Sequence, residues 1–154
     1  MDRLRVPAVL DSLDDVVRYV RELARRAGLS SRRTGQLRLA TEELVTNVIM
    51  HGYRSGSTPD CAVELQGGVD GGQVWLRIVD DAPAFDPTRV PEPDDLRRPL
   101  IDRMPGGLGL YLARSCVDGM SYELVNGRNT VTLTIHCARP PSVSVPYRRG
   151  GQSA

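Results

Sequence analysis

The spacing of apolar residues predicts a long amphipathic helix between Gln36 and His51, a stretch with the sequence QLRLATEELVTNVIMH. Apolar residues recur there at the spacing of the core-facing side of a helix, rather than alternating as they would in a strand. We expect Ser30 or Ser31 to begin this helix and Gly52 to end it. The residues expected to face the core are Leu37, Leu39, Ala40, Leu44, Val45, Val48 and Ile49.

A second pattern, made of polar side chains, follows the same helix. Glu43, Asn47 and His51 are spaced four residues apart, so each lies about one turn beyond the last along one edge. Polar groups beside a core-facing stripe need partners, because leaving one unpaired costs roughly 1–3 kcal/mol. One interpretation is a chance alignment on an ordinary helix, in which His51 is simply favoured by the helix dipole. The other is a functional site.

The first thirty residues predict a strand and a shorter helix. An apolar run at residues 4–10 that contains Pro7 is typical of an edge strand. A helix should follow, capped by Asp11 or Ser12 and ending near Ala27, before Gly28. Its outer face is basic, which we interpret as a solvated surface, with docking of an acidic protein as the alternative. The arginines of this face are Arg18, Arg21, Arg25 and Arg26.

Two hairpins are predicted further along the chain. Residues 61–66 and 73–80 have the composition of strands and are expected to join through the segment GGVDGG. Residues 120–125 and 130–137 form the second pair. Asn126-Gly127 lies between them, a dipeptide that favours tight hairpin turns.

Between the hairpins, the chain from Asp81 to Pro105 shows neither helical nor strand periodicity, and its prolines are interleaved with charges. A loop of this length inside a compact domain is usually functional, typically as a lid, or else disordered. It ends on the sequence GGLG, at the start of a helix predicted for residues 108–117. Backbone N–H groups at a glycine-rich helix start form a site for phosphate.

The order of these elements predicts an α+β fold. Neighbouring strands joined by short turns favour a two-layer α/β sandwich, with a mixed, mostly antiparallel sheet and helices on one face. We expect one domain over residues 1–138. Residues 139–154 show no core-forming pattern and are predicted to be a disordered tail.

Composition narrows the classes of partner. The net charge of +1 gives no general argument for nucleic acid or a membrane surface. The three cysteines lack CxxC spacing, which favours reduced thiols over a zinc site or disulfides. No segment has the length and apolar character of a signal peptide or membrane span, so we expect a cytoplasmic protein.

Four motifs, in the order EELVTNVIMHGY, IVDDAPAFDP, GGLGLYLARSCVDGMSYE and NGRNTVTL, resemble those of the GHKL or Bergerat-fold ATPases. Within that superfamily the chain is similar to the small anti-sigma-factor serine kinases of the RsbW and SpoIIAB type. The motifs span almost all of residues 4–137. The resemblance implies that ATP or ADP is the nucleotide, that Mg²⁺ accompanies it, that the long loop is an ATP lid and that the protein is a homodimer.

The resemblance also implies roles for individual residues. Glu43 matches the catalytic glutamate, which would accept the proton of a substrate serine hydroxyl. Asn47 matches the asparagine whose carboxamide oxygen binds Mg²⁺. Asp80 matches the aspartate that recognises adenine, because its carboxylate accepts a hydrogen bond from the exocyclic amine.

Further nucleotide contacts are implied around these three. Thr130 matches a hydroxyl that helps to hold a water beside the adenine. Ala82 is a departure, because the family usually has glycine there. A Cβ at this position would crowd the adenine or restrict φ, so we expect lower nucleotide affinity. The segment expected to approach the phosphates through its backbone is Gly106, Gly107, Leu108 and Gly109.

Three functional hypotheses follow. The first is a kinase that phosphorylates a STAS-type anti-anti-sigma protein and sequesters a sigma factor. The second is a nucleotide-gated binding module without phosphoryl transfer, motivated by Ala82 and the proline-rich lid. The third is the ATP-binding domain of a sensor kinase, which the lack of a preceding phosphoacceptor-histidine helix disfavours.

Overall fold

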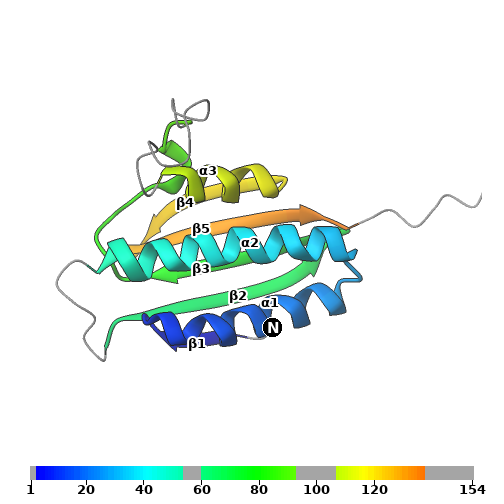
Figure 1. The fold of residues 1–154 in the computed structure, drawn as a ribbon, viewed down its shortest axis with the longest axis horizontal. Coiled ribbons are helices and arrows are strands. Elements are labelled where there is room, and N and C mark those ends of the chain that lie inside the picture. The colour runs from blue at the N-terminus through cyan, green and yellow to red at the C-terminus, as the bar shows by residue number, and fades with distance from the viewer. Residues whose placement is uncertain (1–2, 54–59, 93–106, 138–154) are drawn as a thin grey trace, which may run out of the picture.

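A single antiparallel sheet forms one layer of the computed structural model, which describes residues 3–53, 60–92 and 107–137 (Figure 1). Its strands, in the spatial order β1-β2-β3-β5-β4, are antiparallel at every pairing, so the expectation of a mixed sheet was wrong. The α+β class is confirmed. The strands are β1 (Arg3–Pro7), β2 (Ala62–Asp70), β3 (Gln73–Asp80), β4 (Gly119–Val125) and β5 (Arg128–His136).

Both predicted hairpins are present, but the first is tighter than expected. Its turn is Gly71-Gly72, with φ values of 56° and 77°, and β2 continues through the preceding GGVD segment. A Cβ at Gly68 would lie 2.9 Å from the ring of Trp75, its cross-strand partner. Glycine therefore serves there to admit the indole ring and does not break the strand. The second turn is Asn126-Gly127, with φ values of 51° and 76°.

Helices cover one face of the sheet, as predicted (Figure 1). The central helix α2 lies over β3 and β5, with α1 on the side of β1 and β2 and α3 on the side of β4. Since α2 lies between the other two, its residues can contact both the sheet and α3. The helices are α1 (Leu13–Arg26), α2 (Ser31–Asn47) and α3 (Gly107–Cys116).

The core lies between this helical layer and the sheet. Leu39 was expected to contribute but is 39% exposed, because a rotation of about 200° separates it from buried Leu37 around α2. The largest fully buried side chains are Leu23, Leu37, Leu65, Leu76, Ile78, Leu133 and Ile135.

Capping residues explain where the first two helices begin and end. Ser30 caps α2, since its hydroxyl accepts a hydrogen bond from the Arg33 N–H at 3.2 Å. Ser12 occupies the N-cap position of α1 but makes no side-chain capping bond, because a short 3₁₀ turn, Leu10–Ser12, leads into this helix. Gly28 ends α1 with a φ of 67°, as predicted.

The basic face of α1 is exposed, and most of its charges pair along the helix. Arg18 bonds Asp15 at 2.9 Å, and Arg25 bonds Glu22 at 2.8 Å. Arg26 lies 3.9 Å from Glu22 as well. A solvated face accounts for these contacts, and the docking alternative stays a prediction.

Asp118, in the connection between α3 and β4, joins distant parts of the fold. Its carboxylate accepts a hydrogen bond from the His136 N–H at 2.6 Å and pairs with Arg33 near the start of α2. These contacts, the hydrogen bond from His136 first, lower the pKa of the Asp118 carboxyl. One carboxylate therefore connects the start of α2 to the end of β5.

The predicted division into a domain over residues 1–138 and a tail over 139–154 stays a prediction, because the tail lies outside the described residues. The second half of the expected lid, from residue 93 onward, also lies outside them. Within the described ranges, no helix is both long and apolar enough to cross a membrane.

We expect Asp118→Asn to lower the free energy of unfolding at pH 7 by about 1–2 kcal/mol, because it weakens charge-assisted bonds to two partners. A carboxyl with a lowered folded-state pKa contributes stability that is complete above its ordinary value of 3.8. That contribution is lost as the pH falls through the lower folded-state value. Urea unfolding of wild type and variant from pH 7 to pH 3 measures both effects.

The control is Asp70→Asn, at an exposed position beside the Gly71-Gly72 turn. It should change stability little at any pH. Equal stabilities for the wild type and Asp118→Asn at pH 7 would show that Asp118 does not anchor the fold.

Candidate nucleotide-binding site

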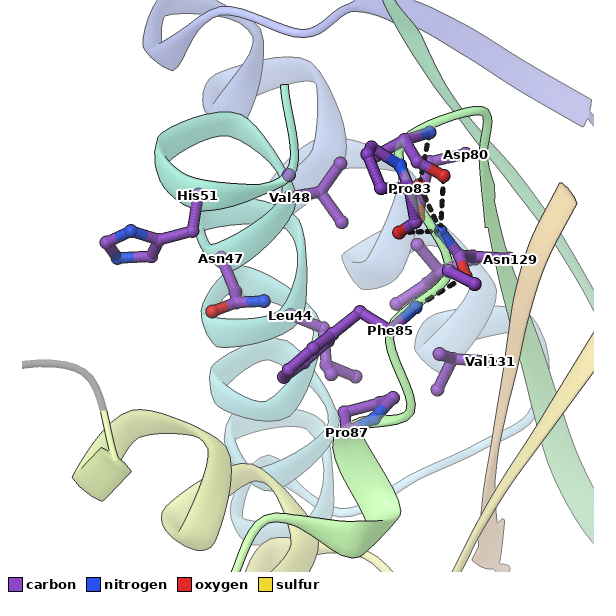
Figure 2. A pocket seen from close by; sticks show the side chains of 14 residues that line it. Leu44, Asn47, Val48, His51, Asp80, Pro83, Phe85, Pro87, Asn129 and Val131 are labelled. Atoms are coloured by element: carbon purple, nitrogen blue, oxygen red, sulfur yellow. Dashed lines mark hydrogen bonds between the residues drawn. The ribbon is translucent and has the colours of Figure 1, made fainter. Parts of the chain in front are cut away.

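A cavity of about 340 Å³ opens between α2 and the loop that leaves β3 (Figure 2). Its walls are largely apolar, and the polar groups come from opposite sides. Asn47 projects from α2, while Asp80 and Asn129 lie together at the ends of β3 and β5. The lining residues that this site depends on are Leu44, Asn47, Asp80, Ala82, Phe85 and Asn129.

Asp80 is the buried carboxylate of this cavity, with 4% of its surface exposed. Its Oδ1 accepts hydrogen bonds from the Ala82 N–H at 3.0 Å and from Asn129 Nδ2 at 2.9 Å. Burial raises the pKa of the Asp80 carboxyl, and the two hydrogen bonds oppose that change. Asp80 lines the cavity, and its role in recognising adenine stays a prediction.

The neighbouring Asp81 points elsewhere. Arg128 bonds Asp81 at 2.7 Å and Glu64 at 3.2 Å, and these contacts raise the pKa of the guanidinium. Of the two adjacent aspartates, Asp80 is therefore the one that can contact a ligand in the cavity.

Asn129 is the site residue that the sequence analysis missed. The motif NGRNTVTL suggested Thr130, but the structure places Thr130 on the opposite face of the sheet, in a separate surface hollow with Glu64 and Arg77. Successive residues of a strand point to opposite faces, so a shift of one position exchanges the two. Asn129, paired in register with Asp80, faces the cavity instead.

The loop after β3 forms the outer wall and is held in place at several points. Phe85 is 47% exposed, and its ring lies across the cavity toward Leu44 (Figure 2). Asp86 caps the short turn that follows by accepting a hydrogen bond from the Thr88 N–H at 2.9 Å. Arg114 of α3 donates to the carbonyl oxygens of Thr88 and Val90.

The polar column of α2 reaches a second, smaller cavity of about 220 Å³. Glu43, Asn47 and His51 all line it, and Asn47 and His51 also line the larger one. The predicted column therefore borders a cavity, and the functional role of its residues stays a prediction. His51 is exposed, and its ring points away from Asp80 and Asn129 (Figure 2).

The glycine-rich segment approaches this smaller cavity at the start of α3. Gly109 lines it, and a Cβ there would overlap Oε2 of Glu43, so the absence of a side chain lets the carboxylate lie against the helix. Gly107 begins α3, whereas Leu108 is half-buried and is not among the described residues lining either cavity. Gly106 lies outside the described residues.

Ala82 is buried and lines the larger cavity without backbone strain. Asn126 is the only described non-glycine residue with a positive φ, so the expected restriction of φ at Ala82 is wrong. Its methyl group faces Gly52, where an added Cβ would lie 3.1 Å from Ala82 Cβ. Gly52 ends a π-helical turn, Val48–Gly52, that follows α2. The missing side chain of Gly52 leaves space for the extra methyl group.

The oxygen ligands available at the two cavities suit a magnesium ion that is bound together with a nucleotide. Within the described ranges, no cluster of three or more His, Cys, Asp or Glu side chains could hold a metal ion. Mg²⁺ commonly takes only one or two protein oxygens and completes its shell with phosphates and water. The Asn47 carboxamide, which borders both cavities, can supply such an oxygen.

Comparisons with known proteins agree with this geometry. Residues 6–135 match the model of the histidine kinase-like ATPase domain. The chain is 32% identical over 137 residues to the serine/threonine-protein kinase BtrW of Bordetella bronchiseptica, covering 89% of this chain and 94% of that one. It is 28% identical over 109 residues to the anti-sigma F factor of Geobacillus kaustophilus, covering 68% and 70%.

A solved structure shares the fold. It contains the RsbU and RsbW domains of a Mycobacterium tuberculosis protein and matches with a TM-score of 0.59 at 20% identity. The match covers 91% of this chain but 34% of that longer one.

Gly52→Ala tests the fit between Gly52 and Ala82. The new methyl group should lower the free energy of unfolding by about 1 kcal/mol through overpacking against Ala82. The cost should be smaller by roughly 0.5 kcal/mol or more in an Ala82→Gly background, because the two residues are in contact. Urea unfolding of the single and double variants measures this coupling.

Gly35→Ala is the matched control, since nothing lies within 4 Å of its Cβ position in α2. It should stabilise the protein by about 0.5–1 kcal/mol through helix propensity. If Gly52→Ala costs the same with Ala82 and with Gly at position 82, the proposed fit is wrong.

Proposed function

The chain belongs to the histidine kinase-like ATPase family, among its serine-protein kinases of the RsbW type, and we propose that it transfers the γ-phosphoryl group of ATP to a serine of a STAS-type anti-anti-sigma protein. We further propose that it sequesters a sigma factor, and that the two binding activities alternate. Sigma factors act in the cytoplasm, so this function is cytoplasmic.

The observation that carries the proposal is that Asn47 lines two cavities whose walls differ in chemical character. The larger one is mostly apolar, contains a single buried carboxylate and has the size of a small-molecule pocket. The smaller one is lined by Glu43 and by Gly109 in the first turn of α3. A purine base fits the chemistry of the first, and phosphates fit that of the second, where helix N–H groups are available.

In the larger cavity, we propose that Asp80 accepts a hydrogen bond from the 6-amino group of adenine. The ring of Phe85 and the side chain of Leu44 would contact the faces of the base. In the smaller cavity, Asn47 would supply an oxygen ligand to Mg²⁺, which when bound neutralises phosphate charge.

Glu43 is the proposed catalytic base. It would accept the proton of the substrate serine hydroxyl while the hydroxyl oxygen forms a bond to the γ-phosphorus and the bond to the ADP oxygen breaks. Its position against Gly109 brings this carboxylate to the expected phosphate end of the site. The adjacent Glu42 pairs with Arg38 at 3.1 Å and lines neither described cavity, so it is not a competing candidate.

A second candidate function is a nucleotide-gated binding module without phosphoryl transfer. The observation that favours it is Ala82, whose methyl group lines the proposed base cavity and reduces the space for a purine. In this alternative the nucleotide would control partner binding only. A homodimer, expected from the family resemblance, stays a prediction under both candidates.

Nucleotide binding is tested by calorimetry with ATP and ADP, with and without Mg²⁺. We expect Mg²⁺ to strengthen ATP binding to the wild type, and Asn47→Ala to abolish that gain, because the variant removes the proposed oxygen ligand. ATP binding without Mg²⁺ should change little. If neither nucleotide binds the wild type, the proposed site is wrong.

Phosphoryl transfer is tested with radiolabelled Mg-ATP and the purified STAS-domain proteins encoded in the same genome. Glu43→Gln should slow transfer by about 10²- to 10⁴-fold while ATP affinity is kept, since the amide cannot accept the proton. Glu42→Gln, the matched control one residue away, should retain the wild-type rate. Nucleotide binding by the wild type without any transfer would support the binding module instead.

A further inference from the structure

We propose that Asn129 is a positioning residue that sets the base preference of the cavity, by holding Asp80 so that one carboxylate oxygen faces the ligand as a hydrogen-bond acceptor. This inference rests on the proposed nucleotide site and adds a determinant of its specificity. Nothing in the sequence motifs assigned a role to Asn129.

The two oxygens of Asp80 have unequal surroundings. Both hydrogen bonds that the described residues donate to this carboxylate reach Oδ1, from Asn129 Nδ2 and from the Ala82 N–H. With Oδ1 occupied in this way, Oδ2 is the oxygen left for a ligand in the cavity that Asp80 lines. A ligand donor, and not a ligand acceptor, therefore complements the ionised carboxylate.

Asn129 can hold Asp80 because its own amide is fixed on both sides. Nδ2 also lies 3.0 Å from the Ala82 carbonyl oxygen and 3.2 Å from that of Pro83. Oδ1 accepts hydrogen bonds from the Phe85 N–H at 3.1 Å and from the Tyr122 hydroxyl at 2.7 Å.

A flipped Asn129 amide would place NH₂ against two donors and the oxygen against three acceptors. The side chain is also almost fully buried, with 4% exposure. One orientation is therefore strongly preferred, and in it the donor faces Asp80 (Figure 2).

The protonation state of Asp80 decides which purine it complements. The carboxylate accepts from a 6-amino group, whereas the protonated acid can donate to a 6-oxo group. Burial raises the pKa of the Asp80 carboxyl, and the hydrogen bond from Asn129 lowers it. Without Asn129 the acid form would persist to higher pH, and discrimination against 6-oxo purines would weaken.

Among the described residues, the other ionisable groups near Asp80 lie on several elements. Asp81 raises the pKa of the Asp80 carboxyl and Arg128 lowers it, and both belong to the ion pair described above. The Tyr53 hydroxyl accepts the Asp81 N–H at 3.1 Å, and His51 lines the cavity from the π-helical turn.

The test compares the affinities of ATP and inosine triphosphate, which carries a 6-oxo group, from pH 6 to pH 8. In the wild type we expect a preference for ATP. In Asn129→Leu, similar in size, that preference should fall about tenfold, roughly the value of one hydrogen bond. The loss should be larger at the lower pH, because loss of the Asn129 hydrogen bond raises the pKa of the Asp80 carboxyl.

Tyr122→Phe is the matched control. It removes one of the two donors to Asn129 Oδ1, but the Phe85 N–H and the three acceptors around Nδ2 still fix the amide orientation, so the ATP preference should stay near the wild-type value. If Asn129→Leu weakens both nucleotides equally at every pH, Asn129 is merely structural and the proposal is overturned.

Asn129→Ala provides a second variant in case the leucine variant does not fold. It removes the donor to Asp80 without adding a group that must fit the buried position. The ATP preference should again fall, and an unchanged preference would overturn the inference. Failure of the wild type to bind either nucleotide would instead contradict the proposed function itself.

Discussion

The pairing of Asp80 with Asn129 is the interaction on which the candidate site depends. These residues face each other at the end of β3 and the start of β5, and the hydrogen bond between their side chains links the two strands. The same asparagine contacts backbone atoms of Ala82, Pro83 and Phe85. The cavity thus has a preformed wall built from two strands and a loop, with its buried carboxylate in a defined orientation.

The helix α2 supplies the opposite wall. Because of its periodicity, different residues of this helix line the two cavities. Leu44 packs at the larger one, Glu43 reaches the smaller one, and Asn47 borders both. Adjacent residues on a helix point about 100° apart, so Glu43 and Leu44 necessarily face different surroundings. A single rigid element therefore fixes the proposed base-binding surface and the proposed proton acceptor relative to each other.

Most of the fold and the α2 side of the site could be predicted from the sequence, because helical spacing and turn dipeptides are local signals. The wrong predictions concern positions whose surroundings are set by the pairing of strands that are distant in the sequence. Which of Asn129 and Thr130 faces the cavity depends on strand register, which no local pattern reveals. Likewise, Gly67 and Gly68 look like turn residues, but the cross-strand position of Trp75 makes Gly68 a strand residue that admits an aromatic ring.

The departure from the family at Ala82 shows why single positions cannot be judged alone. A methyl group at this place would be expected to obstruct the cavity, but part of the space it needs comes from Gly52, at the end of the π-helical turn after α2. The Cβ of Ala82 on one wall thus faces Gly52, which has no Cβ, on the other. Since the backbone at Ala82 has no positive φ, the substitution reshapes the cavity without straining the loop. The expected effect of Ala82 on a ligand is therefore steric, because its methyl group changes the shape of the cavity and leaves the backbone of the loop unstrained.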